Sequence, residues 1–421
     1  MTLGQIGLKY KAHIKDPHIA DMFYKCFMNT YETTVMHSFD DEVFVITGDI
    51  PAMWLRDSSA QVRHYLHFVN ECQEAYELIL GLLRCQMRRI LIDPYANAFN
   101  KGPDNVGHRD DVTNMNPYIW ERKYEIDSLC YPIVLAYDFW QEANSTEQFD
   151  SVFYAATLSI VSLWETEQNH VSSPYMFERS NCPPSDTLPN NGFGAPVEYT
   201  GMTWSGFRPS DDACEYGYHV PSNMFAMVAL ERLAQIFEEI YSDSKSAERA
   251  RKLRGQIKSG IDKFAIVEHD KYGQVFAYEV DGKGNFNLMD DANVPSLLSL
   301  PYIGCVDYND FIYINTRKMI LSEDNPFFYC GSFLNGIGSP HTRPGYVWPI
   351  SLCMQGLTDP DNATRESIIR LIAKTDAGCG FVHESVNVNN PMEYSRPWFA
   401  WANSLFAELV IRQIDAVGGI E

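Results

Sequence analysis

Six segments of the chain concentrate carboxylates, arginines, histidines and tryptophans, the side chains that sugar chemistry requires. Asp and Arg form paired hydrogen bonds with hydroxyl groups, and the apolar faces of sugar rings pack against Trp. Cleavage of a glycosidic bond needs two carboxyl groups, one as proton donor and one as base or nucleophile. The segments are residues 48–58, 108–127, 204–212, 290–293, 341–348 and 383–398.

Each segment also has a purely structural interpretation. Asp57 can cap a helix, and Asp211 with Asp212 can occupy a cap and a first helical turn. His383 and Glu384 can form an ordinary ion pair in a loop. For any one segment taken alone, the structural interpretation is at least as good as the catalytic one. The catalytic interpretation gains weight because the six clusters fall at equivalent places in a repeating pattern.

Other chemistries find little support in the sequence. His108, Asp110 and Asp111 suggest a metal site, but no HExxH or EF-hand spacing accompanies them. A GxSxG motif is absent, and no phosphate-binding glycine pattern follows a predicted strand. We therefore predict an enzyme with neither a metal nor a cofactor.

Apolar residues recur at helical spacing from end to end of the chain. Asp16 and Pro17 provide a cap and a first-turn proline, and Ser145 to Gln148 has the pattern of a capping box. Strands are predicted only at 43–47, 275–280 and 286–289, the last two joined by a turn at 281–285. The predicted helices are 17–38, 57–70, 72–92, 125–142, 145–167, 221–241, 244–265, 293–299, 307–321, 346–357, 361–374 and 397–415.

The connections between these helices alternate in length. Every connection that leads into an even-numbered helix is long. Every other connection between successive helices is a short turn. In a barrel of six helical hairpins the inner helices run parallel, so the loops that enter them meet at one end. The pattern therefore predicts an all-α fold, an (α/α)6 barrel with one small β-hairpin, as a single domain over residues 1–421. Such a barrel is expected to bring all six polar segments to one cavity.

Four of the polar segments resemble the signature blocks of glycoside hydrolase family 125, the exo-α-1,6-mannosidases. They are residues 49–58 (DIPAMWLRDS), 207–212 (FRPSDD), 289–296 (MDDANVPS) and 383–385 (HES), in the family's order. The resemblance spans nearly the whole chain and departs from none of the main blocks. It implies an (α/α)6 barrel, inversion of configuration, no metal requirement, and removal of terminal α-1,6-linked mannose from oligosaccharides or N-glycan fragments.

By this resemblance the general acid is Asp211 and the general base is Glu384, with Glu393 as the reserve candidate for the base. The sequence alone does not separate Asp211 firmly from Asp212. Asp211 must be protonated at neutral pH, and we expect burial beside the negative Asp212 to raise its pKa. In an inverting enzyme the two carboxyl groups lie about 6.5–9.5 Å apart, which leaves room for a water molecule.

Further residues of the polar segments are predicted to bind the sugar. Arg56 and Asp57 are expected to hold the hydroxyls of the terminal mannose, and the tryptophans to form walls. The predicted substrate-binding residues are Trp54, Arg56, Asp57, Trp204, Ser205, Arg208, Asp212, Asp290, Asp291, His341, Trp348, His383 and Trp398.

Composition and charge limit the partners. With 55 acidic and 33 basic residues the formal net charge is -22, which disfavours nucleic acid and anionic membranes and suits a neutral substrate. No apolar stretch has the length of a signal peptide or a membrane span. The ten cysteines are scattered without a CxxC pair, as expected for reduced thiols. We therefore expect a cytoplasmic protein that acts as a monomer.

Two alternatives remain open on the sequence. A glucoamylase-like hydrolase or a sugar phosphorylase can share this architecture, and phosphate-dependent release of a sugar phosphate would identify the second. A sugar-binding or regulatory protein would bind mannose without hydrolysing it, although the presence of both Asp211 and Glu384 argues against this.

Overall fold

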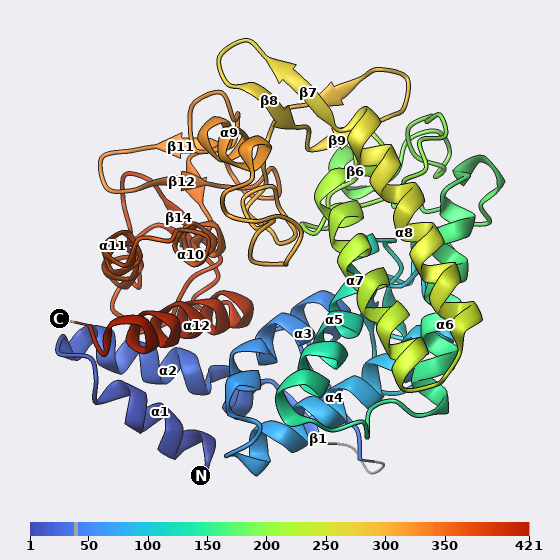
Figure 1. The fold of residues 1–421 in the computed structure, drawn as a ribbon. Helices are drawn as coiled ribbons and strands as arrows, with labels where there is room; N and C mark the ends of the chain where they lie inside the picture. Colours follow the sequence, from blue (N-terminus) through green and yellow to red (C-terminus); the bar gives the residue numbers. More distant parts are fainter. Residues whose placement is uncertain (38–40, 421) are drawn as a thin grey trace.

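The computed structural model describes residues 1–37 and 41–420, and this part of the chain is mostly helical (Figure 1). Short 3-10 helices lie at Arg63–Phe68, His170–Ser172 and Pro184–Asp186. The α-helices are α1 (Leu3–Lys11), α2 (Pro17–Thr33), α3 (Leu55–Val62), α4 (Gln73–Ile92), α5 (Ile126–Ala143), α6 (Ser151–Glu167), α7 (Val220–Glu239), α8 (Ser244–Phe264), α9 (Phe311–Ile320), α10 (Pro349–Leu357), α11 (Asn362–Ala373) and α12 (Ala400–Val417).

The strands are short and form sheets of two or three strands. The predicted hairpin at 281–285 is confirmed, since β9 pairs with β10 across it. The predicted strand 275–280 is divided in two, because its first part belongs to β8, which pairs with β7 instead. The strands are β1 (Val35–His37), β2 (Val43–Val45), β3 (Met53–Trp54), β4 (Ala98–Phe99), β5 (Ile119–Glu121), β6 (Tyr218–His219), β7 (Ile266–His269), β8 (Gly273–Phe276), β9 (Glu279–Val280), β10 (Phe286–Asn287), β11 (Phe328–Cys330), β12 (Asn335–Ile337), β13 (Tyr346–Val347), β14 (Ser385–Asn387) and β15 (Tyr394–Ser395).

Five helices contact one another in series around the middle of the molecule. α10 packs against α12, α12 against α3, α3 against α5, and α5 against α7. These are five of the six helices predicted to be inner ones. A second set lies outside them, where α2 packs on α12, α8 on α7, and α4 contacts both α5 and α6 (Figure 1). The loops that carry the polar segments lead into the inner helices.

The remaining predicted inner helix, 293–299, the fourth in chain order, is not a helix in this structure. Its residues form turns instead. The Asp290 carboxylate accepts hydrogen bonds from the backbone N–H groups of Leu297 and Leu298, at 2.8 and 3.0 Å. In a helix those N–H groups would bond to carbonyl oxygens four residues earlier, and Pro295 has no N–H to offer. A side chain therefore takes the place of the helical hydrogen bonds.

Helix ends differ from the predictions where a stronger local partner is present. α2 begins at Pro17 with Asp16 as its cap, as predicted, but it ends at Thr33 because Val35 begins a strand paired with Val45. The end predicted at residue 38 lies outside the described residues. α6 begins at Ser151 with Asp150 as its cap, so the capping box predicted at Ser145 is wrong. The helix Leu3–Lys11 was not predicted, although Thr2 and Gln5 form a capping box at its start.

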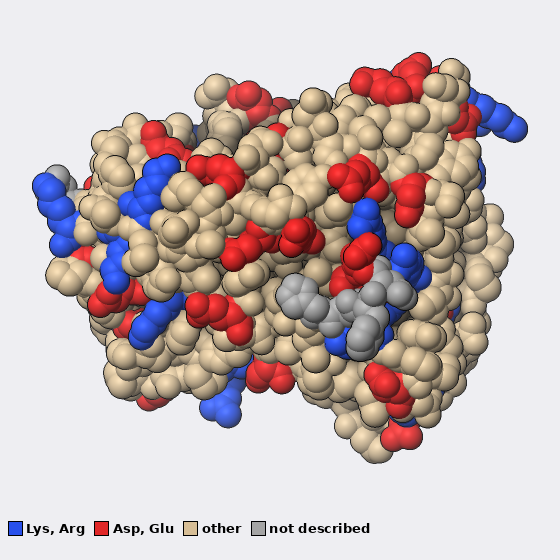
Figure 2. All heavy atoms as spheres, turned by 90° about the horizontal axis from the view of Figure 1, so that it is seen from below, with Lys and Arg blue, Asp and Glu red and all other residues tan. Residues whose placement is uncertain are grey.

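The buried apolar side chains form one large cluster that runs from Leu3 to Ile420. A small separate cluster of Ala52, Trp54 and Ala98 lies beside the polar loops. In the described part of the chain no helix is both long and apolar enough to cross a membrane. Figure 2 shows acidic side chains spread over one face with basic ones among them, and no broad basic patch on that face.

Candidate active site

One cavity, with about 400 Å³ of empty space, collects side chains from the polar loops. Both predicted catalytic carboxylates, Asp211 and Glu384, line it, although 173 residues separate them in the chain. Trp54, Arg56, Asp57, His341 and Trp348 of the predicted sugar-binding residues line it too. The remaining lining residues are Thr47, Ile50, Pro209, Ser210, Asn293, Arg396 and Phe399.

The floor of this cavity is a buried guanidinium surrounded by four carboxylates. Arg56 donates through Nη1 to Asp57 at 2.6 Å and through Nε to Asp127 at 3.2 Å. Its Nη2 donates to both oxygens of Glu125 at 3.1 Å and to Oδ1 of Asp211 at 3.0 Å. We refer to these five residues as the Arg56 cluster. Its four partners come from three separate segments, so only the folded chain assembles it.

Local structure explains how the Arg56 cluster is presented. Arg56 and Asp57 lie in the first turn of α3. Asp127 lies in the first turn of α5, two residues after Glu125, which is the N-cap of that helix. Carboxylates are favoured at this end of a helix because the free backbone N–H groups there carry partial positive charge. The two helices pack against each other, which brings both sets of side chains to the same end of the inner helices.

Asp211 occupies an unusual backbone conformation, with a φ of 66°. It lies at the tip of a tight turn in which the Arg208 N–H donates to the Asp212 carbonyl oxygen at 2.7 Å. Left-handed conformations are uncommon for residues other than glycine, although Asp tolerates them. Lys123 fixes the turn by donating from Nζ to the Asp211 carbonyl oxygen at 2.7 Å. The turn thus holds the Asp211 carboxylate against Arg56 and the cavity.

Burial and the shared cation set the protonation of the cluster. Burial raises the pKa of Glu125 well above its ordinary value, although Arg56 opposes this and Asp211 adds to it. Burial also raises the pKa of Asp127 to about 6. For Asp211, burial favours the neutral form, but Arg56, a hydrogen bond with Glu125, Lys123 and His341 outweigh it, so its pKa lies below the ordinary value. The expectation that Asp211 itself has a raised pKa in the empty site is therefore wrong.

Glu384 lines the same cavity among different partners. Its side chain is about 10% exposed. Ser395 donates from Oγ to Oε2 of Glu384 at 2.8 Å, and Arg396 Nε lies 3.4 Å from Oε1. These contacts hold the carboxyl group in a fixed orientation. The reserve candidate, Glu393, is exposed and bonds to Asn387 and Asn390 instead.

Asp212 points away from Asp211 and toward His341. Its Oδ1 lies 3.4 Å from Nδ1 of His341, and its Oδ2 is buried without a protein partner. Burial would lower the pKa of His341, but the hydrogen bond with Asp212 raises it to about 9. The two neighbouring aspartates thus have separate partners, since Asp211 bonds to Arg56 and Asp212 to His341.

Several predicted sugar-binding residues support the loops instead of lining the cavity. Trp204 is in the core, stacked on His170 with ring centroids 3.4 Å apart. Arg208 pairs with Glu279 at 2.6 Å, and the Asp290 carboxylate holds a backbone turn. The others in this group are Ser205, bonded to the Phe207 carbonyl, Asp291, bonded to Asn293, and His383, stacked on Tyr394. Trp398 is half-buried near Gly48, outside the lining set.

Sequence reasoning missed Glu125 and Asp127 as parts of the site. Their segment was recognised as polar, but no role was assigned to either residue. The available signal was a pair of acids at the start of a helix predicted to be an inner one. Ser210 and Asn293 were also missed. Ser210 lines the cavity, and its buried hydroxyl interacts with Asp291.

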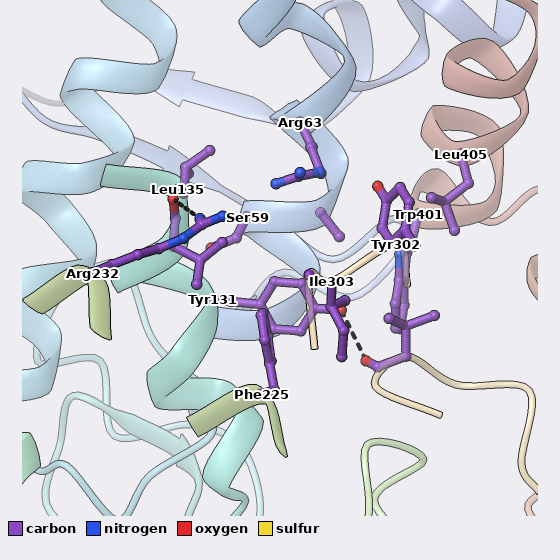
Figure 3. A pocket seen from close by; sticks show the side chains of 14 residues that line it. Ser59, Arg63, Tyr131, Leu135, Phe225, Arg232, Tyr302, Ile303, Trp401 and Leu405 are labelled. Atoms are coloured by element: carbon purple, nitrogen blue, oxygen red, sulfur yellow. Dashed lines mark hydrogen bonds between the residues drawn. The ribbon is translucent and has the colours of Figure 1, made fainter. Parts of the chain in front are cut away.

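A second cavity lies on the other side of Trp401, which lines it (Figure 3). The Arg56 guanidinium lies 5.7 Å from the ring centre of this tryptophan. Tyr131, Leu135, Phe225 and Ile303 also line this second cavity (Figure 3), and neither predicted catalytic carboxylate does. The Arg56 guanidinium thus packs near Trp401, and the cavity that Trp401 lines has apolar and aromatic side chains together with Arg63 and Arg232.

Comparisons with known proteins identify the family of the chain. The family model described as metal-independent alpha-mannosidase (GH125) matches residues 16–411. The meiotically up-regulated gene 157 protein of Schizosaccharomyces pombe is 40% identical over 96% of this chain and 84% of its own length. A metal-independent α-mannosidase of Streptococcus pneumoniae, solved in a non-productive complex with α-1,6-mannobiose, is 46% identical, with a TM-score of 0.95 over 98% of this chain and 97% of that one.

More distant structures share the fold alone. A glycosidase in complex with glucose is 12% identical, with a TM-score of 0.56 over 97% of this chain and all of that one. A rhamnosidase from Klebsiella oxytoca is 13% identical, with a TM-score of 0.52 over 95% of this chain and 64% of that one. A carboxylate-lined cavity at one end of a helical fold defines the chain as a glycoside hydrolase. It belongs to glycoside hydrolase family 125, the metal-independent α-mannosidases.

Proposed function

We propose that this protein is an inverting, exo-acting mannosidase that removes terminal α-1,6-linked mannose from oligosaccharides such as N-glycan fragments. The observation that carries the proposal is that Asp211 and Glu384 line one cavity with unlike surroundings. The linkage is supported by the α-1,6-mannobiose bound to the Streptococcus pneumoniae relative, whose study concerns N-linked glycans.

In the proposed mechanism Asp211 is the general acid. It donates a proton to the glycosidic oxygen while the bond between that oxygen and the anomeric carbon breaks, and the leaving alcohol keeps the bonding electrons. Glu384 is the general base. It takes a proton from a water molecule that attacks the anomeric carbon from the opposite face. Ser395 and Arg396 keep Glu384 oriented for this step.

The shape of the cavity supports cleavage at a chain end. The Arg56 cluster closes its floor, and Trp401 packs behind the guanidinium. Trp54 and Trp348 are buried side chains that line the walls. We infer from this that the cavity accepts a terminal sugar and does not let a glycan chain continue through it. Ser210 and Asn293, which also line the cavity, carry polar groups that suit sugar hydroxyls.

We further propose that the whole chain is one catalytic domain with (α/α)6 barrel architecture. In this barrel the turns at 293–299 take the place of the inner helix that was predicted there. The single large apolar cluster supports one domain. The acidic charge supports a neutral glycan as the partner rather than nucleic acid or a membrane surface. The ten free cysteines support action in a reducing compartment such as the cytoplasm. A monomer is the proposed active form.

The test is incubation of the purified protein with α-1,2-, α-1,3- and α-1,6-linked mannobioses, followed by analysis of the products. We expect mannose from the α-1,6-linked substrate and little or none from the others. Release of mannose that required phosphate, with a sugar phosphate as product, would instead identify a phosphorylase. Tight mannose binding without hydrolysis of any α-mannoside would identify a binding protein.

A further inference from the structure

The Arg56 cluster contains more negative charge than its cation balances. With every group ionised, four carboxylates would surround one guanidinium in a site where Asp57, Glu125 and Asp127 are almost fully buried. Like charges this close favour uptake of a proton by one of them. The cluster therefore holds at least one proton at neutral pH, and its geometry identifies where that proton lies.

Glu125 and Asp211 are the two carboxylates that share one nitrogen of the arginine. Both oxygens of Glu125 lie 3.1 Å from Nη2 of Arg56, and Oδ1 of Asp211 lies 3.0 Å from the same atom. The shared nitrogen brings the two carboxyl groups close together, and each affects the pKa of the other. Two ionised carboxylates repel each other at such close range, which favours a proton on one of them.

The surroundings place this proton on Glu125. Glu125 is fully buried and pairs with Arg56, whereas Asp211 is partly exposed and also faces Lys123 and His341. The charged and polar groups that face the pair are Arg56 and Asp57 from α3, Asp127 and Ser128 from α5, Asn97 from the loop after α4, Lys123 from the loop before α5, and His341 from the loop before α10.

We propose that Glu125 is a positioning residue that holds the catalytic proton for Asp211. The proton passes from the Glu125 carboxyl to the Asp211 carboxylate, which leaves Glu125 ionised beside Arg56. Asp211 then donates it to the glycosidic oxygen as the bond to the anomeric carbon breaks. The water that attacks this carbon gives its own proton to Glu384, which later releases it to solvent, and Glu125 takes up a proton again.

This inference rests on the proposed roles of Asp211 and Glu384, and it reconciles them with the charges around Asp211. Arg56, Lys123 and His341 would keep an isolated Asp211 ionised and useless as an acid. Asp211 and Glu125 titrate as a coupled pair. The apparent pKa for loss of the first proton is therefore a property of both groups and not of Asp211 alone. Asp57, Glu125 and Asp127 are almost fully buried, so water screens their charges poorly and the cluster must balance them largely by itself.

The first test compares Glu125→Gln with the matched control Glu167→Gln, a fully buried glutamate that bonds to His170 away from the cavity. We expect Glu125→Gln to move the alkaline limb of the kcat/KM profile to lower pH by about one unit or more, because Asp211 alone keeps its proton less well. Activity on α-1,6-mannobiose near pH 7 should fall about a hundredfold, and activity on an aryl mannoside with an activated leaving group by less than about threefold.

The second test detects the proton directly and does not depend on turnover. Infrared spectroscopy of the intact protein near pH 7 should show the C=O band of a neutral carboxylic acid that Glu125→Gln removes and Glu167→Gln leaves in place. Ser128→Ala, which removes a hydrogen bond to Glu125, should raise the pH at which this band disappears. It serves as the second variant if Glu125→Gln does not fold.

The outcomes separate the two proposals. If no band is lost in Glu125→Gln, or no band shifts in Ser128→Ala, Glu125 holds no proton and the inference is overturned, whatever the activity. An equal loss on both substrates with an unchanged pH profile would reduce Glu125 to a structural role and would also overturn it. A band that depends on Glu125, in a protein that hydrolyses no α-mannoside, would refute the proposed function while leaving the shared proton established.

Discussion

Removal of the Arg56 guanidinium is expected to destabilise the protein strongly, and more at high pH than at low pH. In Arg56→Met the side chain keeps a similar length, but Asp57, Glu125, Asp127 and Asp211 lose their common cation. Breaking a buried ion pair by removal of one partner costs about 3–5 kcal/mol. With four carboxylates left facing each other, we expect a loss in that range or above it at about pH 8, where an exposed carboxylate is ionised.

The pH dependence follows from proton linkage. Burial already raises the pKa values of Asp57 and Asp127 above their ordinary values, and Arg56 opposes this rise. Against the effect of burial, Arg56 also holds the pKa of Asp211 below its ordinary value. Removal of Arg56 therefore raises all three pKa values further, and the folded variant binds more protons than the folded wild type or the unfolded chain. Stability is retained below the unfolded pKa, at about pH 4, and is lost as pH rises, by about 1.4 kcal/mol per pH unit for each extra proton held.

Urea unfolding followed by tryptophan fluorescence at about pH 5 and about pH 8 measures this loss. The control is Arg251→Met, which removes an exposed ion pair with Glu238 and should cost less than about 1 kcal/mol at either pH. The reasoning is refuted if Arg56→Met costs no more than the control, or if its loss is larger at the lower pH.

Three further predictions concern catalysis. Asp211→Ala and Glu384→Ala should each lower turnover of α-1,6-mannobiose at least about a hundredfold while the fold and sugar binding remain, with Asp211→Ala least harmful on an activated aryl mannoside. Wild-type activity of Glu384→Ala together with an inactive Glu393→Ala would show the base to be misassigned. Exhaustive chelation should leave activity unchanged, and a loss reversed by calcium would contradict this. Proton NMR of early hydrolysis should show β-mannose first, because a single displacement inverts the anomeric centre, whereas early α-mannose would exclude the inverting mechanism.

Local sequence patterns were sufficient for most of the helices and for the family. Apolar stripes at helical spacing predicted eleven of the twelve α-helices in the described residues, with ends that differ where caps or strands compete. The blocks at 49–58 and 207–212 placed Arg56 and Asp211 in loops that enter inner helices, and both line the cavity. These features are readable because helix caps, side-chain periodicity and contiguous motifs depend on neighbours within a few residues.

The roles of individual side chains depended on contacts that the sequence does not show. Trp204 and Arg208 lie in the same polar segment as Asp211, yet one packs on His170 and the other pairs with Glu279. Glu125 became part of the site only because packing of α3 against α5 brought it to Arg56, 69 residues earlier in the chain. Protonation in the Arg56 cluster depends on burial and on the number of charges that meet there, and only the tertiary structure sets both quantities.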